Sequence, residues 1–560
     1  MLVVRKHHFL VRWSHWLNVP ILLGLILSGI SIYWASPVYQ HKPDPNTENF
    51  DVAADIGIWI CAHVPGQHHY NSPPDWTYNH MSLGPGMLAL ALRLHWLCAY
   101  LFMLNGMVYV AGLVSGGGWR SLLPRRTNLL DALRMFRYYL GFPFAKLARR
   151  QWLHPLFNTK YNALQRAAYF SVPVAGFLSV ATGLAIHNLM RSDAKPMQLH
   201  WLAALFGGYN AARVWHFWLM WVYIVFVVPH VILVLADGWD TLRSMIVGWS
   251  TRVGRRRSSE MNNEEKGDIP STGVEPEVKS VSVKKPQSFF GERPLPAIEM
   301  APRVLRHQSR RDFLVFGAGA LAALAGAGFL LPQDTLSRMG VRRNMDCPGN
   351  EWFLNKPLRI DDDVAEALYS LNRRVPTYTK SQITPLKNTY NGATPDPGYI
   401  PGWKLTLDGL ASGVSISLDI RNLLTRFSVH EQITRLVCVE GWSAIAWWAG
   451  LRFDDLLRAF PPMAQTKWAR VESSVNLDAS GNPDPYFMSI DLATARHPQT
   501  LLATHFNGQP LTVDHGAPLR LLVPVKLGLK NVKAITKIAY FAEEPRDYWT
   551  DRGYSYYDGI

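Results

Sequence analysis

Four long apolar stretches in the first 250 residues limit what this chain can fold into. They cover roughly residues 16–34, 87–114, 167–189 and 214–236, and a membrane-crossing helix needs about 20 apolar residues. A spanning helix bonds its own backbone N–H and C=O groups, which lipid cannot do. The sequence therefore predicts an all-α, four-helix transmembrane bundle over residues 1–250.

A fifth apolar run begins much later, at residue 313, directly after the segment SRRDFL at residues 309–314. This is a twin-arginine signature, which addresses a folded protein to an export machinery. We predict a twin-arginine signal and fifth transmembrane helix at residues 309–332, retained because the run lacks a clean small-x-small cleavage site. A basic flank before an ordinary membrane helix is the alternative.

The basic residues predict the orientation in the membrane. Arg and Lys crowd residues 120–166, precede the first span and follow the fourth, whereas residues 35–82 hold only Lys42. Cationic loops stay in the cytoplasm, so the C-terminal domain should lie on the outer, periplasmic face of a bacterial cytoplasmic membrane. Residues 251–308, rich in charge, Ser and Pro, are predicted to be a cytoplasmic linker. Membrane orientation thus explains the net charge of +15 better than nucleic-acid binding does.

Four histidines lie in the predicted spans: His15, His95, His216 and His230. The last two are 14 residues apart, which returns them to nearly the same helix face about 21 Å apart. Intramembrane ionisable residues are usually functional, and axial histidines hold haem iron. The orientation pairs His95 with His216 near the outer face and His15 with His230 near the inner face. We predict two haem b groups; for any single histidine, a hydrogen bond to a neighbour is the alternative.

This region resembles the diheme cytochrome b family of formate dehydrogenase gamma subunits and nickel–iron hydrogenase cytochromes. The matching pieces are RWSHW at residues 12–16, Ser28-Gly29, RLH at residues 93–95, and the spacing of the last two histidines. The resemblance implies electron exchange between a quinone pool and an outer redox partner. It gives no role to six further histidines: His63, His68, His69, His80, His187 and His200.

From about residue 345, short apolar segments alternate with turns, which predicts a mixed α and β domain. Cys438 ends one such segment, in RLVCVEGW at residues 435–442. A thiolate is a soft ligand that suits a redox metal, although a lone cysteine at a strand end is more often a small buried apolar residue.

The region around Cys438 resembles the molybdopterin domain of sulfite oxidases and, more closely, of periplasmic methionine sulfoxide reductase catalytic subunits. The resemblance covers roughly residues 385–545 and includes WAGL at 448–451 and DHGAPLR at 514–520. It implies an α+β sulfite oxidase-type molybdopterin domain at residues 333–560, with Cys438 on molybdenum and Tyr486 as a catalytic residue. The implied cofactor-binding residues are Asn388, Tyr390, Ser473, His515, Arg520, Asn531 and Lys533.

Two departures from the sulfite oxidase pattern bear on function. Residues 439–443 contain no Arg, although sulfite oxidases carry one shortly after the metal cysteine to bind the oxyanion. The chain also lacks the sandwich domain through which sulfite oxidases dimerise, so we expect a monomeric molybdopterin domain.

These features predict a fused membrane oxidoreductase. Electrons would pass from quinol through two haems to molybdenum, where an S-oxide or N-oxide, such as a methionine sulfoxide-type substrate, is reduced. One alternative is quinone-linked oxidation of sulfite or another sulfur compound. Others are an electron-transfer cytochrome with a metal-free docking domain, and the membrane anchor of a hydrogenase or formate dehydrogenase complex.

Overall fold

The computed structural model describes most of the membrane region and of the C-terminal domain. Described are residues 2–5, 7–34, 83, 87–123, 128–147, 163–190, 200–237, 239–250 and 297–299. Beyond these, 306–317 and 360–367 are described in part, then 369–387 and 394–557 except 441, 479, 481, 483 and 546. Most of the predicted fifth span and most of the predicted linker lie outside the described residues.

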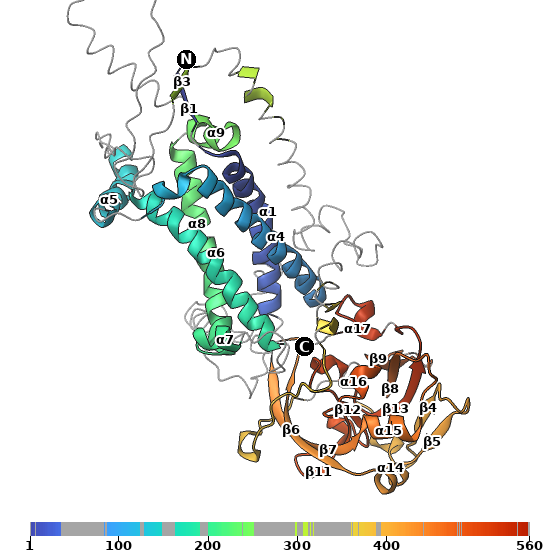
Figure 1. The fold of residues 1–560 in the computed structure, drawn as a ribbon. Helices are drawn as coiled ribbons and strands as arrows, with labels where there is room; N and C mark the ends of the chain where they lie inside the picture. Colours follow the sequence, from blue (N-terminus) through green and yellow to red (C-terminus); the bar gives the residue numbers. More distant parts are fainter. Residues whose placement is uncertain are drawn as a thin grey trace, which may run out of the picture. The chain divides into compact units, whose positions relative to one another are not determined.

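Four long helices form the membrane region (Figure 1): α1 (Phe9–Trp34), α4 (Leu88–Ser115), α6 (Ala163–Met190) and α8 (Tyr209–Asp237). Each contains a stretch long and apolar enough to cross a membrane. The prediction of four apolar spans is therefore confirmed. The chain divides into two compact units, one made of Met1–Gly24, Cys98–Ala181 and His216–Leu330, the other of the remaining residues.

Within the first unit, α4 packs closely against α1. A Cβ atom on Gly112 would lie 2.8 Å from Leu10 Cβ, and one on Gly116 would lie 3.0 Å from His8 Cβ. One turn apart on the same face, these glycines let the two backbones approach, as small residues do in membrane helix pairs. Buried Asn105 of α4 also hydrogen-bonds to α1: its Nδ2 donates to Ser14 O at 2.8 Å and to Asn18 Oδ1 at 2.7 Å.

Shorter elements flank these helices. They are η2 (Gly118–Ser121), α5 (Asn128–Leu147), α7 (His200–Leu205) and α9 (Trp239–Val247). A small sheet of order β2-β1-β3 joins Trp249–Ser250, Leu2–Arg5 and Ala297–Glu299. The sequence analysis treated residues 120–166 as a loop and 251–308 as a linker without regular structure. The structure instead places a 20-residue helix in the first segment and strand β3 in the second.

The C-terminal domain contains two five-stranded sheets (Figure 1), which confirms the predicted α+β class. The first has the order β11-β10-β7-β6, with β12 also on β10; the strands are Gln509–Pro510, Leu501–Phe506, Ser443–Arg452, His430–Val437 and Arg520–Leu522. The second has the order β5-β4-β13-β8-β9; the strands are Ile416–Leu418, Leu405–Asp408, Ile535–Phe541, Trp468–Asn476 and Pro485–Asp491. Among the described strands, only β4 and β13 pair in parallel.

Alternating burial along the strands builds the core of this domain. In β8, every second residue from Ala469 to Val475 is buried, the two-residue period of a strand with one face inward. The largest core cluster joins residues of both sheets, including Leu451, Ile490 and Ile538. Short helices complete the domain: α14 (Ile420–Arg426), α15 (Phe453–Ala459), α16 (Leu492–Ala495) and α17 (Tyr548–Asp551). The first sheet carries Cys438 at the end of β6, where the candidate site begins.

Candidate functional site

The structure brings together the two histidines that we paired near the inner face. The rings of His15 on α1 and His230 on α8 have centroids 6.1 Å apart and planes inclined at 55°. Two imidazoles on one metal, with metal–nitrogen distances of about 2.0 Å, have ring centres roughly 6 Å apart. Buried His15 Nδ1 has no hydrogen-bond partner among the described residues. The pair therefore fits a haem iron with two axial imidazoles.

Aromatic packing sets the orientation of both rings. Phe226, one turn earlier on α8, stacks on His230 with centroids 5.2 Å apart, and Tyr169 on α6 meets it edge-on. Trp16 lies edge-on to His15 at 5.4 Å. Pro229 precedes His230 inside α8 and has no N–H to donate along the helix, which loosens the backbone at this point. Neighbouring aromatic rings thus orient both imidazoles.

His95 on α4 has a different support. Its Nδ1 lies 2.9 Å from Ser28 Oγ, and that hydroxyl donates to Leu25 O at 3.2 Å. Because the hydroxyl proton is directed at Leu25 O, the bond to Ser28 suits the tautomer in which His95 Nδ1–H donates, and Nε2 is then the ring nitrogen that would bind a metal. Ser28 is fully buried. Ser28 lies in a quoted sequence motif, but nothing in the motif predicts that it supports a ligand.

His216 on α8 is half-buried, and it hydrogen-bonds to the backbone of Ser179 on α6. A backbone hydrogen bond on one ring nitrogen is the usual support of a metal-binding histidine. The pairing of His216 with His95 stays a prediction, because the two residues belong to different compact units.

In the C-terminal domain, Cys438 lies in the tight turn between β6 and β7. The turn closes with a hydrogen bond from Cys438 N to Trp442 O at 2.8 Å. Glu440 Oε2 lies 4.0 Å from the sulfur and accepts from Trp442 Nε1 at 2.9 Å. Burial and the charge of Glu440 raise the pKa of the Cys438 thiol to about 12. The protein alone thus keeps the thiol protonated, and a bound metal cation would supply the charge that makes it a thiolate ligand.

A second segment presses against Cys438. A Cβ atom on Gly528 would lie 3.1 Å from Leu436 Cδ2 and 3.2 Å from Val437 O, and 3.6 Å from Cys438 Cα. Gly528 begins the short helix η6 (Gly528–Lys530), so only a residue without a side chain allows this approach. Asn531 follows: its Oδ1 accepts from Val523 N at 2.7 Å and its Nδ2 donates to Leu527 O at 3.2 Å. We predicted a cofactor contact for Asn531. In the structure, both polar atoms of its amide form hydrogen bonds to the backbone of the surrounding loop.

The predicted basic residues His515, Arg520 and Lys533 form one cluster. Arg520 Nη1 donates to His515 O at 3.1 Å, and Lys533 Nζ donates to Asp514 O at 3.0 Å. Gly516, at φ +97°, lets the turn pass beside Lys533, where a Cβ atom would lie 2.9 Å from Lys533 Cβ. Burial, then Arg520 and Lys533, lower the pKa of His515 to about 4; burial, then Arg520, lower the pKa of Lys533 to about 7. Crowded cations of this kind are stabilised by a bound anion such as phosphate.

An aromatic platform lies under this cluster. The Arg520 guanidinium is 4.7 Å from the ring centroid of fully buried Trp448. Phe506 bridges Trp448 and His515, with centroid distances of 5.0 and 4.4 Å. Among the described residues, buried Trp448 Nε1 and His515 Nδ1 have no hydrogen-bond partner. These two ring nitrogens fit the polar edge of a bound pterin or its phosphate. The sequence analysis missed Trp448, whose signal was only its place in the WAGL motif.

The remaining predicted site residues are placed as follows. Buried Ser473 on β8 donates to Lys533 O at 2.8 Å, so it fixes the backbone at Lys533. Tyr486 on β9 packs edge-on against Tyr548, with centroids 5.4 Å apart. Strand β9 also contacts η6, the same short helix that Gly528 brings against the Cys438 turn. Asn388 and Tyr390 lie outside the described residues.

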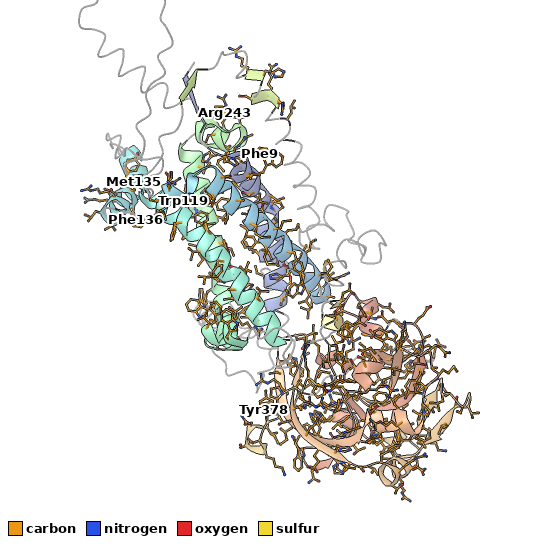
Figure 2. All side chains as sticks on the ribbon, viewed as in Figure 1. Phe9, Trp119, Met135, Phe136, Arg243 and Tyr378 are labelled. Carbon is orange, nitrogen blue, oxygen red and sulfur yellow. The ribbon has the colours of Figure 1, made fainter. Side chains whose placement is uncertain are left out.

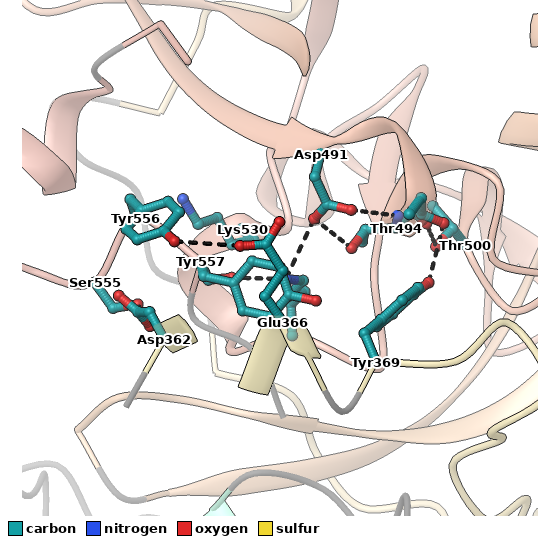
Figure 3. Close-up of polar contacts among 12 residues, drawn as sticks. Asp362, Glu366, Tyr369, Asp491, Thr494, Thr500, Lys530, Ser555, Tyr556 and Tyr557 are labelled. Atoms are coloured by element: carbon teal, nitrogen blue, oxygen red, sulfur yellow. Dashed lines mark hydrogen bonds and ion pairs between the residues drawn. The ribbon is translucent and has the colours of Figure 1, made fainter. Parts of the chain in front are cut away.

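Two lysines of the loop that contains Asn531 form ion pairs inside the domain. Lys530 Nζ lies 2.9 Å from Asp547 Oδ2, and Lys526 Nζ lies 3.4 Å from Asp491 Oδ2. Lys526 Nζ also donates to Tyr557 O at 2.8 Å. Figure 3 shows Asp491 and Tyr557 in this network. The lysines of this loop thus have two roles. Lys526 and Lys530 hold the loop in place through ion pairs, whereas Lys533 belongs to the basic cluster.

Comparisons with known protein families agree with this division. Residues 6–248 match the family described as prokaryotic cytochrome b561, and residues 391–549 match the oxidoreductase molybdopterin binding domain. The protein is therefore an oxidoreductase in which a membrane cytochrome b is joined to a molybdopterin domain. In particular, it belongs to the prokaryotic cytochrome b561 family through its N-terminal region and carries an oxidoreductase molybdopterin binding domain after it. The predicted fusion and enzyme class are confirmed.

Individual relatives match different shares of the chain. A putative protein-methionine-sulfoxide reductase subunit, YedZ1, of Azospira oryzae is 34% identical over 205 residues, which are 36% of this chain and 74% of the relative. The protein-methionine-sulfoxide reductase catalytic subunit MsrP of Burkholderia mallei is 28% identical over 285 residues, 48% of this chain and 80% of the relative. MsrP of Xanthomonas campestris pv. campestris is 38% identical over 143 residues, 24% of this chain and 44% of the relative.

Proposed function

We propose that this protein takes electrons from quinol and passes them through two haem b groups to a molybdenum centre that reduces S-oxides or N-oxides. The observation that carries the proposal is that one chain holds both an imidazole pair spaced for haem iron and, in its C-terminal domain, a cysteine in a tight turn and a cluster of crowded basic residues. The relatives named as protein-methionine-sulfoxide reductase subunits support a methionine sulfoxide-type substrate.

Each cofactor has candidate residues in this chain. His15 and His230 would hold the inner haem, and His95 and His216 the outer haem, with Ser28 orienting His95. When bound, haem supplies one-electron transfer and the molybdenum–pterin group supplies oxygen-atom transfer.

In the molybdopterin domain, Cys438 would ligate molybdenum through Sγ. The cluster of His515, Arg520 and Lys533 would bind the phosphate of the pterin, with Ser473 holding the backbone of Lys533. We assign Tyr486 to the substrate side of the site. The cofactor roles predicted for Asn388, Tyr390 and Asn531 remain part of the proposal.

We infer the direction of the reaction from the residues that follow Cys438 in the sequence. Reduction of a sulfoxide consumes two electrons and two protons and yields a thioether and water. An anion such as sulfite needs a cation beside the metal, whereas residues 439–443 contribute Glu440 and no Arg. A carboxylate at this position repels a sulfite anion but tolerates a neutral sulfoxide. We therefore favour reduction of a neutral S-oxide or N-oxide over oxidation of sulfite.

The proposed location follows from the charges of the loops. We place residues 251–308 in the cytoplasm, residues 309–332 in a twin-arginine signal that remains as a fifth span, and residues 333–560 on the periplasmic side as a monomeric domain. Ser309 at the start of the signature accepts a hydrogen bond from Arg243 Nη2 on α9 at 3.3 Å. This contact fits a signature that begins beside the cytoplasmic ends of the spans.

The first test is metal analysis of detergent-purified protein, with Cys438→Ser beside the parent. We expect two Fe and one Mo per chain, and loss of Mo but not Fe in the variant. Cys98→Ser, a buried cysteine of α4, is the matched control and should keep both metals. Absence of Mo from the parent would refute the catalytic role and favour an electron-transfer cytochrome.

Substrate direction is tested on the reduced protein. We expect methionine sulfoxide to reoxidise the haem absorption bands of the dithionite-reduced parent but not those of Cys438→Ser. Reduction of the oxidised haems by sulfite would instead establish the opposite direction of flow.

A further inference from the structure

Helix α5 has an exposed apolar stripe that the redox function does not use. Leu130, Leu133 and Phe136 follow one another at intervals of three residues, which places them on one face of the helix. Their exposed fractions are 65%, 56% and 52%. Met135, in contrast, is fully buried, so the opposite side of α5 faces protein. Figure 2 marks Met135 and Phe136 on this helix.

Two exposed arginines lie on the same face as the stripe. Arg134 lies one turn beyond Leu130, and Arg137 lies one turn beyond Leu133, so each guanidinium stands beside an apolar side chain. Arg134 bonds Asp131 Oδ1 at 3.1 Å, yet its side chain is 71% exposed. The long apolar stems of such residues can lie along lipid while the charge stays at the headgroups.

The position of α5 in the chain defines what can cover this face. The helix lies between two candidate spans, Leu88–Ser115 and Gln165–Ile186, and is joined to the first by residues 116–127. The short connection to the first span therefore keeps the N-terminal end of α5 close to the membrane surface. Lipid-packing helices of the membrane interface combine an apolar stripe with flanking Arg and Lys in this way.

We propose that α5 lies in the plane of the membrane, with Leu130, Leu133 and Phe136 among the acyl chains and Arg134 and Arg137 on anionic phospholipid headgroups. The partner is the lipid surface itself, because two arginines beside an apolar stripe complement negative headgroups. The proposal stands apart from the redox function and requires neither haem nor molybdenum.

The test is hydrogen exchange of the full chain in nanodiscs, with either phosphatidylcholine alone or a mixture with phosphatidylglycerol. Each surface cation contributes a factor of about five to binding of anionic lipid. With two arginines, we therefore expect the amides of α5 to exchange roughly 25-fold more slowly in the anionic discs. Arg134→Glu/Arg137→Glu should abolish this dependence on lipid, and Leu133→Ser/Phe136→Ser should speed α5 exchange in both discs.

Controls separate lipid binding from misfolding and from a general surface effect. Exchange in α4 and α6 must be unchanged in the variants. Helix α14, with exposed Arg421 and Leu424, is the reference helix and should exchange equally in both discs, also in Arg421→Glu. Equal exchange of α5 in the two lipid compositions would overturn the proposal. So would protection that depends on protein concentration in detergent, since that would indicate a second copy as the partner.

Discussion

Asp547 anchors helix η6, which packs against Cys438, through buried hydrogen bonds and an ion pair. Replacing this carboxylate tests whether these contacts stabilise the candidate site. The Asp547 side chain is fully buried. Oδ2 accepts from Lys530 Nζ at 2.9 Å and from Ser489 N and Oγ at 3.0 Å each. Oδ1 accepts from Thr550 N at 2.9 Å and Oγ at 2.8 Å. One carboxylate thus joins η6, β9 and the start of α17.

The perturbation is Asp547→Asn, which removes the charge and keeps the size. Lys530, whose side chain is 1% exposed, then loses the Asp547 carboxylate that lies 2.9 Å from its Nζ, and breaking a buried ion pair in this way costs roughly 3–5 kcal/mol. For a domain of this size, 1 kcal/mol moves Tm by about 2–4 °C. We therefore expect Tm of the C-terminal domain to fall by roughly 6–20 °C.

A double-mutant cycle isolates the ion pair. Lys530→Met leaves Asp547 with its hydrogen bonds from Ser489 and Thr550 and should cost less than Asp547→Asn. In Lys530→Met/Asp547→Asn no buried charge is left unpaired, so the loss should be smaller than the sum of the two single losses. Losses that simply add would refute the coupling.

The effect should also depend on pH. Burial raises the pKa of Asp547, but Lys530 and the backbone N–H groups of Ser489 and Thr550 outweigh it, so the pKa lies below the ordinary carboxyl value. A lowered folded-state pKa contributes stability above the unfolded pKa of about 4, and this is lost as pH falls through the folded value. The difference between parent and Asp547→Asn should therefore be full at neutral pH and shrink in acid.

The assay is thermal unfolding of the full chain in detergent, followed by near-ultraviolet circular dichroism, with haem absorbance as a separate signal for the helices. Asp551→Asn changes an exposed carboxylate of the same helix and is the matched control. We also expect Asp547→Asn to lower the molybdenum content, because η6 packs beside Cys438. A Tm as high as that of the Asp551→Asn control would refute the reasoning.

Three further predictions concern the cofactors. His230→Ala should lower haem content to about half, measured as pyridine haemochrome, because one of two axial pairs is lost; an unchanged content would exclude His230 as a ligand. Ser28→Ala should shift one of two haem midpoint potentials, since the support of His95 Nδ1 is removed; Ser28→Thr retains a hydroxyl and should shift it less, and two unmoved potentials would contradict this role. Arg520→Lys keeps the charge but loses the planar group over Trp448, so pterin content should fall in a fluorescence assay of the extracted cofactor; full retention would assign Arg520 to packing alone.

The sequence predicted the elements whose signal is local. Apolar length gave the four spans, because lipid imposes a minimum run of apolar residues. The same runs could not reveal α5, because basic residues interrupt its apolar residues and charge counting then assigns the segment to a loop. Strand β3 was hidden for a related reason, since its pairing with β1 joins residues about 300 positions apart and leaves no periodic pattern in three residues.

The candidate site divides in the same way. Cys438 could be found from its motif, and the basic residues from theirs. The sequence does not show which of the basic residues face a ligand, because Lys526, Lys530 and Lys533 look alike in sequence. The fold pairs the first two with buried carboxylates and leaves Lys533 beside Arg520.

By itself, the sequence determined that this chain has a membrane region with intramembrane histidines, followed by a molybdopterin-type domain with one cysteine at a strand end. These features depend on local apolar length, residue type and short motifs. Only the tertiary structure decided that His15 and His230 lie 6.1 Å apart, that Ser28 supports His95, and that Gly528 lets a loop approach Cys438. These arrangements join residues distant in the chain, and their geometry is set by packing between elements rather than by the pattern within any one of them.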